Sequence, residues 1–262
     1  MASKLIPFPK MAIARPRVLI SLLLVLAAPA VADEAIPAEP AAISSEPTVA
    51  RTIRPLVGWQ LHISRRLLAE QPEATAKAIR LLEDQLEEVV RVVPADVVAK
   101  LRQVPLYFSP GYPDTSPRAE YHPDAGWLRE HGRDPAMARA VEFTNIPLFE
   151  QETRRMPNFA LHELAHAYHH RELPDGFENR DVIAAFERAR AGGRYERVER
   201  RDSEGRVSHE RAYAMTNPQE YFAESSEAYF SRNDFYPSCR EELRQHDPFG
   251  LATLETLWGV SR

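Results

Sequence analysis

The sequence contains a single cysteine, Cys239, among its 262 residues. An intrachain disulfide or a thiolate metal cluster needs more than one cysteine, so neither can hold this fold together. Basic residues are also scarce relative to acidic ones, 33 against 38, which gives a formal net charge of -5. A chain without a net basic field does not recruit nucleic acid by neutralising phosphates. We therefore expect a packed core, a half-buried or buried thiol, and no nucleic-acid partner.

Long apolar runs are also missing, because the apolar run at residues 18–28 falls short of the roughly 20 residues that cross a bilayer. Basic residues and no acidic residue precede it: Lys4, Lys10, Arg15 and Arg17. The small-residue sequence Ala30-Val31-Ala32 follows. This order is typical of a secretory signal peptide. We predict a signal peptide at residues 1–32, export to the periplasm or beyond, and no stable membrane anchor after cleavage.

The rest of the chain divides into a short leader and one domain. Residues 33–54 are rich in Ala, Pro, Glu and Ser without apolar periodicity, which is typical of a flexible leader. The remaining residues, 55–262, are enough for one well-buried core, and the 44% hydrophobic content of the whole chain is ordinary for a globular protein. We therefore predict one domain over residues 55–262.

The apolar pattern of this domain indicates both strands and helices. Alternation predicts strands at residues 56–64, 104–109 and 140–149, and Pro147 suggests that the third strand lies at a sheet edge. Helical spacing predicts helices at residues 73–93, 157–171, 181–191, 218–230 and 240–258. A charged hairpin is expected at residues 195–211, either simply exposed or in contact with a substrate. The fold class is therefore α+β.

One predicted helix carries the sequence His162-Glu163-Leu164-Ala165-His166. Two histidines four residues apart lie on the same helix face, one turn apart, so one metal ion can bind both imidazoles. The intervening glutamate then stands beside the open coordination position as a base. The alternative is a histidine-rich helix whose imidazoles only satisfy local hydrogen bonds. The choice depends on a third ligand.

Three nearby residues are candidates for that ligand. The longer metalloprotease pattern requires Gly at the position of His169 and His at the position of Glu172, and neither is present. We expect His169 and His170 to be exposed or near the substrate, beyond the reach of the metal. Glu220 is the better candidate, but Asn217-x-x-Glu220 is also a capping box. From spacing alone the two interpretations are equal.

The predicted helix at residues 218–230, which carries Glu220, allows a second interpretation without a metal. Its carboxylates at positions i, i+4 and i+7 could form a solvated acidic stripe: Glu220, Glu224 and Glu227. A stripe of this kind would have no part in a metal site.

A resemblance favours the metal site. It rests on the His162 to His166 motif together with Tyr213, Thr216-Asn217 and Glu220-Tyr221-Phe222-Ala223-Glu224. These two blocks resemble the zinc metallopeptidase family of the anthrax lethal factor catalytic domain, and they are similar to secreted Pro-Pro endopeptidases. The resemblance implies a zincin-like metallopeptidase domain with a mixed sheet whose edge strand lies beside the active-site helix.

The resemblance also implies the roles of the site residues. One Zn²⁺ per chain would be bound by His162, His166 and Glu220. Glu163 and Tyr213 would be the catalytic residues, as base and as hydroxyl donor. A further carboxylate, Glu224, would orient a ligand histidine. Nothing in the sequence resembles the receptor-docking or translocation portions of the toxin, so its host substrates do not carry over.

The expected function is that of a secreted zinc-dependent endopeptidase, which hydrolyses a protein or peptide substrate with a zinc-activated water and a glutamate base. A zinc amidase acting on a cell-wall amide would use the same site chemistry. A catalytically silent zinc-binding module and a metal-free structural protein are the remaining alternatives. A silent module would need neither Glu163 nor Tyr213, and structural zinc sites usually have four protein ligands.

Overall fold

The computed structural model describes residues 50–260 of the chain. The predicted signal peptide at residues 1–32 and the leader up to residue 49 lie outside the described residues. The first strand, β1 (Arg51–Leu56), begins four residues before the predicted domain boundary at residue 55. Most of its side chains are exposed, so its sequence shows no apolar pattern that would mark a strand. No helix within residues 50–260 is long and apolar enough to cross a bilayer.

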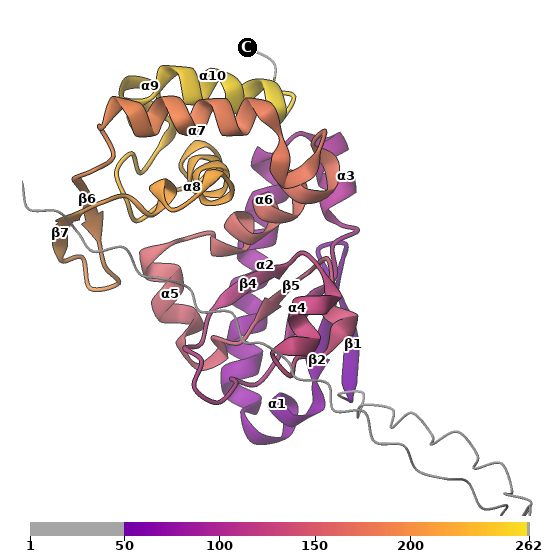
Figure 1. The fold of residues 1–262 in the computed structure, drawn as a ribbon. Coiled ribbons are helices and arrows are strands. Elements are labelled where there is room, and N and C mark those ends of the chain that lie inside the picture. Colours follow the sequence, from indigo (N-terminus) through magenta and orange to yellow (C-terminus); the bar gives the residue numbers. More distant parts are fainter. Residues whose placement is uncertain (1–49, 261–262) are drawn as a thin grey trace, which may run out of the picture. The chain divides into compact units, whose positions relative to one another are not determined.

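The centre of the fold is a five-stranded mixed sheet in the order β1-β2-β3-β5-β4 (Figure 1). The interior strands β2 (Trp59–Ser64), β3 (Leu106–Phe108) and β5 (Ala140–Phe143) run parallel to one another. The two edge strands, β1 and β4 (Ala119–His122), are antiparallel to their neighbours. The predicted α+β class is confirmed, and its sheet is mixed.

The predicted first strand, residues 56–64, is the second half of a hairpin. β1 pairs with β2 through a two-residue turn, with Leu56 opposite Trp59. Both turn residues have left-handed backbone angles, with φ at 50° in Val57 and 92° in Gly58. Such a turn matches the twist of the paired strands. The Arg102 guanidinium holds it by donating to the Val57 carbonyl at 3.1 Å.

The prediction that Pro147 marks an edge strand is wrong. β5 ends at Phe143, and the proline lies in the following 3-10 helix, η2 (Ile146–Leu148), where a missing N–H costs nothing. β5 is an interior strand between β3 and β4. The edge beside it is β4, which lies between the predicted strands at residues 104–109 and 140–149, where we predicted no strand. Its four residues are too few and too polar to give an alternating apolar signal.

Helices cover both faces of the sheet. α1 (Arg65–Glu70), α2 (Pro72–Val92) and α3 (Ala95–Leu101) connect β2 to β3. On the inner face, aromatic rings of the sheet pack against α5 (Phe149–Arg155) and α6 (Phe159–Glu172), and the Phe143 and Phe159 centroids are 6.0 Å apart. The outer face is covered by α4 (Ala125–Glu130) and η1 (Pro135–Met137), which bury Tyr107.

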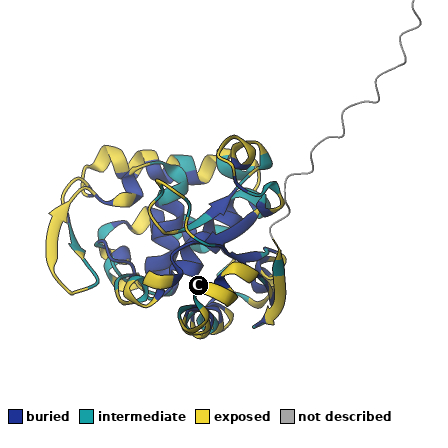
Figure 2. Cartoon of the chain, turned by 90° about the horizontal axis from the view of Figure 1, so that it is seen from below, coloured by how far each residue is buried: buried dark blue, intermediate teal, exposed yellow. Residues whose placement is uncertain are grey.

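The C-terminal half is helical apart from one hairpin. It contains η3 (Gly176–Glu178), α7 (Arg180–Gly192), β6 (Val198–Arg201), β7 (Val207–Glu210), η4 (Tyr213–Met215), α8 (Pro218–Phe230), α9 (Arg240–His246) and α10 (Pro248–Leu257). The predicted helix at residues 218–230 is confirmed. The one predicted at residues 240–258 is two helices, because Asp247 caps a second one that begins at Pro248. The hairpin β6–β7 lies at the surface (Figure 2).

The helices α6 and α8 are held together by the end of α10. Trp258 is fully buried and stacks on Tyr168 of α6 at 4.4 Å and on Phe222 of α8 at 5.8 Å. Its indole N–H donates to the Ser226 hydroxyl of α8 at 2.9 Å. Contacts of this kind fix how the two helices cross, and the candidate site lies where they meet.

Candidate metal centre

The position of α6 is fixed at its first turn by α2. Asn158 caps the helix by accepting from the Leu161 N–H at 2.9 Å. Its amide group also donates to the Gln85 carbonyl of α2 at 3.0 Å. The Gln85 side chain accepts from the Ala160 N–H at 3.0 Å, which satisfies another N–H of the first turn. α6 is thus held in the core, and nearly all of its residues are buried.

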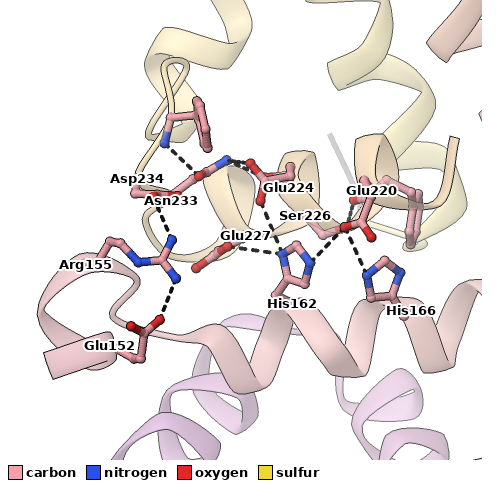
Figure 3. Close-up of polar contacts among 12 residues, drawn as sticks. Glu152, Arg155, His162, His166, Glu220, Glu224, Ser226, Glu227, Asn233 and Asp234 are labelled. Carbon is pink, nitrogen blue, oxygen red and sulfur yellow. Dashed lines mark hydrogen bonds and ion pairs between the residues drawn. The ribbon is translucent and has the colours of Figure 1, made fainter. Parts of the chain in front are cut away.

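The two motif histidines point from α6 toward α8, where one carboxylate faces both of them (Figure 3). Oε2 of Glu220 is 3.3 Å from Nε2 of His162 and 3.4 Å from Nε2 of His166. The structure therefore brings together the three predicted ligands.

Of the two hydrogen bonds of a capping box, the described residues form only the one accepted by Asn217. Asn217 does cap α8, since its Oδ1 accepts from the Glu220 N–H at 2.8 Å. A capping box also needs the glutamate carboxylate to accept from the Asn217 N–H. Among the hydrogen bonds of the described residues there is none of that kind, because the carboxylate is turned toward the imidazoles. Glu220 is therefore available as a ligand while Asn217 caps the helix.

The donor set fits a zinc ion. Charge-assisted hydrogen bonds are usually about 2.7–2.9 Å long, shorter than the separations of 3.3 and 3.4 Å seen here. Ligand atoms about 2.0–2.1 Å from a tetrahedral zinc ion are about 3.4 Å apart. Two imidazole nitrogens and one carboxylate oxygen, with a fourth position open, are a catalytic zinc ligand set.

The electrostatic field at these residues favours a cation. Burial by itself would raise the pKa of Glu220, but the two imidazoles facing it hold that pKa well below its usual range. Burial would likewise lower the pKa of His162, yet the carboxylates of Glu220 and Glu227 raise it well above its usual value. Positive charge is therefore stabilised between α6 and α8, where the proposed ion would lie.

The predicted base, Glu163, faces the edge strand rather than the sheet interior. Its Oε2 accepts from the Tyr121 N–H of β4 at 2.8 Å. The His122 carbonyl, one residue along, instead accepts from Arg139 on the β5 side. The Tyr121 N–H therefore points away from β5, toward α6. Glu163 lies in a cleft of about 770 Å³ that is also lined by both motif histidines and Glu220.

Tyr213 also lines this cleft. It begins η4, just before α8, and its side chain is 48% exposed. Partial burial, assisted by the charge of Glu220, raises the pKa of its hydroxyl, so Tyr213 keeps its proton at neutral pH. A hydroxyl donor and the predicted base therefore line the same cleft.

The second nitrogen of His162 faces two further carboxylates of α8. Glu224 Oε1 is 3.5 Å from Nδ1, and Glu227 Oε2 is 3.4 Å from it (Figure 3). Both residues are buried, with 2% and 0% of their surface exposed, so the solvated-stripe interpretation is wrong for them. We predicted Glu224 as the residue that orients a histidine and missed Glu227. The available signal was its place seven residues after Glu220, on the same helix face.

We predicted that His169 is exposed or near the substrate, but it is buried and is not among the residues that line the cleft. It is 0% exposed because η3 and α8 cover this part of α6, and its ring packs against Phe177 and Phe222 at 5.2 and 5.0 Å. Neither ring nitrogen has a hydrogen-bond partner among the described residues. His170 is partly exposed and shares a 2.8 Å hydrogen bond with the Tyr121 hydroxyl. Neither histidine belongs to the ligand group.

Burial of His169 should make the apoprotein sensitive to acid. Burial, assisted by the nearby His166 and His170, lowers the pKa of His169 to about 3. The pKa of a histidine in an unfolded chain is about 6.5. Between these values the unfolded state binds the extra proton, so stability is lost as the pH falls below 6.5. The loss attributable to this residue is about 2 kcal/mol at pH 5.

We expect His169→Phe to remove that part of the pH dependence. Urea denaturation of the wild type and the variant, both treated with a chelator, should show a smaller fall in unfolding free energy from pH 7.5 to pH 5 in the variant. Since every other ionisable group is present in both proteins, the comparison isolates the contribution of His169. An identical fall in the two proteins would contradict the assignment.

One wall of the cleft is fixed by a buried aspartate. Asp234, in the loop after α8, accepts from Arg155 of α5 at 2.7 Å and from Arg200 of the hairpin at 3.0 Å. Arg155 also pairs with Glu152 at 2.6 Å (Figure 3). The predicted hairpin is confirmed as β6–β7, and its Arg200, like Arg211 just after it, lines the cleft.

Comparison of the chain with protein-family models, curated proteins and solved structures finds no match.

Proposed function

We propose that the chain is an exported zinc-dependent endopeptidase with a zincin-like fold, related to the lethal factor and Pro-Pro endopeptidase type. The observation that carries the proposal is the carboxylate of Glu220, which faces both imidazoles of the His162 to His166 motif at 3.3 and 3.4 Å. Glu163 and Tyr213 line the same cleft. A silent zinc-binding module would have no need of these two groups.

A zinc ion held by His162, His166 and Glu220 would polarise a carbonyl and lower the pKa of a bound water. The residues around it supply the proton transfers. Glu163 accepts the Tyr121 N–H with Oε2, which leaves Oε1 to take a proton from the attacking water and to pass it to the leaving amine. The Tyr213 hydroxyl, which is protonated at neutral pH, donates to the oxygen on which negative charge develops.

The edge strand offers a way to align a peptide. β4 is a sheet edge, and its residues Ala119, Glu120 and Tyr121 line the cleft. An extended peptide can add to such an edge through backbone hydrogen bonds. We propose that β4 binds the substrate.

The test is cleavage of a diverse peptide library by the purified protein, with products read by mass spectrometry. We expect cuts that disappear after treatment with a chelator and return when zinc is added. Zinc binding near one per chain without any cut would contradict the endopeptidase proposal. A silent module, or an amidase with a non-peptide substrate, would then be favoured.

Tyr213→Phe should lower kcat on a cleaved peptide by about 100-fold, because removing one oxyanion donor typically has an effect of this size. Zinc content should stay the same, since the hydroxyl is not among the three ligands. The measurement pairs kcat with metal analysis of the same preparation. A wild-type kcat would remove Tyr213 from the mechanism.

A further inference from the structure

The buried carboxyl of Glu227 has no role in the mechanism above. It is 0% exposed, and among residues 50–260 neither of its oxygens makes a hydrogen bond. Burying a carboxyl without partners is strongly destabilising. Oε2 of Glu227 lies 3.4 Å from Nδ1 of His162. This nitrogen is also buried without a hydrogen-bond partner.

The orientation of the His162 ring explains the arrangement. Nε2 faces Glu220, and Nδ1 faces α8 on the other side of the ring. If a metal ion binds Nε2, the ring proton resides on Nδ1 and needs an acceptor. The carboxylates of Glu224 and Glu227 both lie near Nδ1, at 3.5 and 3.4 Å. Glu224 already accepts a hydrogen bond from the Asn233 side-chain amide through Oε2, at 2.8 Å. Among the described residues, neither oxygen of Glu227 has a hydrogen-bond partner, so it is the acceptor that is free for this proton.

We propose that Glu227 is a positioning residue of the metal centre, which holds the His162 ring with Nε2 toward the ion by accepting its Nδ1 proton together with Glu224. The inference rests on the metal-binding part of the proposed function, and it does not require peptidase activity. His166 differs, because no described carboxylate lies within ion-pair distance of its Nδ1. Of the two motif histidines, His162 is thus the one whose Nδ1 faces carboxylates.

The informative variant is Glu227→Leu, which replaces the carboxyl with an apolar side chain of similar size. If Glu227 had only a structural role, removing a buried and poorly paired carboxyl would leave stability equal or higher and zinc binding unchanged. If it positions His162, zinc affinity should fall by about 10- to 100-fold, as for other partners of ligand histidines. Stability without metal and affinity for zinc therefore separate the two roles.

The experiment measures the zinc dissociation constant by competition with a chromophoric chelator, and the unfolding free energy of each metal-free protein. Glu227→Gln is the second variant, since it is isosteric and should fold. Glu142→Gln is the matched control, because Glu142 is an equally buried carboxyl that pairs with His122 on the outer face of the sheet. We expect weaker zinc binding in both Glu227 variants and wild-type affinity in the control.

Three results would overturn the inference. The first is wild-type zinc affinity in Glu227→Leu, which would leave the proposed function intact. The second is two zinc ions per wild-type chain, because Nδ1 would then be a ligand and not a proton donor. The third is a wild type that binds no zinc at all, which would also overturn the proposed function.

Discussion

Glu163→Gln should lower kcat/KM on a cleaved peptide by about 100- to 10,000-fold, the usual contribution of a general base. The amide keeps the shape of the side chain, and its oxygen can still accept from the Tyr121 N–H that now binds Glu163 at 2.8 Å. It cannot take a proton from water. Kinetic constants and zinc content, measured on the same preparation, should therefore show lost turnover with the metal retained.

A matched control lies on the same helix. Glu172 ends α6, and its only ion pair among the described residues is with Lys100 at 3.7 Å. Glu172→Gln removes the same charge from α6 away from the cleft, so its kcat/KM should match that of the wild type. Full activity in Glu163→Gln would exclude Glu163 as the base, whereas equal losses in both variants would indicate a general effect on the helix.

Glu220→Gln should weaken zinc binding by more than about 100-fold, because a ligand contributes more than the groups that merely support ligands. Glutamine can serve the first turn of α8 nearly as well as glutamate, but it lacks the charge that faces His162 and His166. The measurement is the zinc dissociation constant by chelator competition. Unchanged affinity would show that Glu220 is not a ligand.

The neighbouring cap provides the opposite variant. Asn217→Ala removes the side chain that accepts from the Glu220 N–H. Losing such a cap costs about 1 kcal/mol of stability. We expect Asn217→Ala to lower the unfolding free energy and largely to keep zinc affinity. Glu220→Gln should instead lower zinc affinity and largely keep the unfolding free energy of the metal-free protein. Parallel effects in the two variants would mean that the cap and the ligand cannot be separated.

Local signals predicted the two helices of the site well. Asn217 and Pro218 mark the start of α8, and the spacing of His162 and His166 is enough to place both on one face of α6. Whether Glu220 faces the imidazoles depends on how α8 crosses α6. That crossing is set by contacts such as those of Trp258, which come from a distant part of the chain. No spacing within α8 could decide it.

The edge strand was missed for a related reason. Glu120 and His122 of β4 look like loop residues, and they are buried or half-buried because partners elsewhere satisfy them. Arg133 donates to Glu120 at 2.6 Å, and His122 pairs with Glu142 of β5 at 2.9 Å. The pairing also explains Glu142, a buried acid in the middle of an apolar strand. A polar network between strands leaves no periodic signal in either one.

The meeting of α6 and α8 at one carboxylate also bears on how a chain with a single cysteine keeps its shape. A metal ion held by His162, His166 and Glu220 would close a loop over the whole stretch of chain between the two helices. Closing a long loop removes conformational freedom from the unfolded chain in the same way as a disulfide bridge. The ion would thus be a removable cross-link, so a chelator would lower the stability of the folded protein.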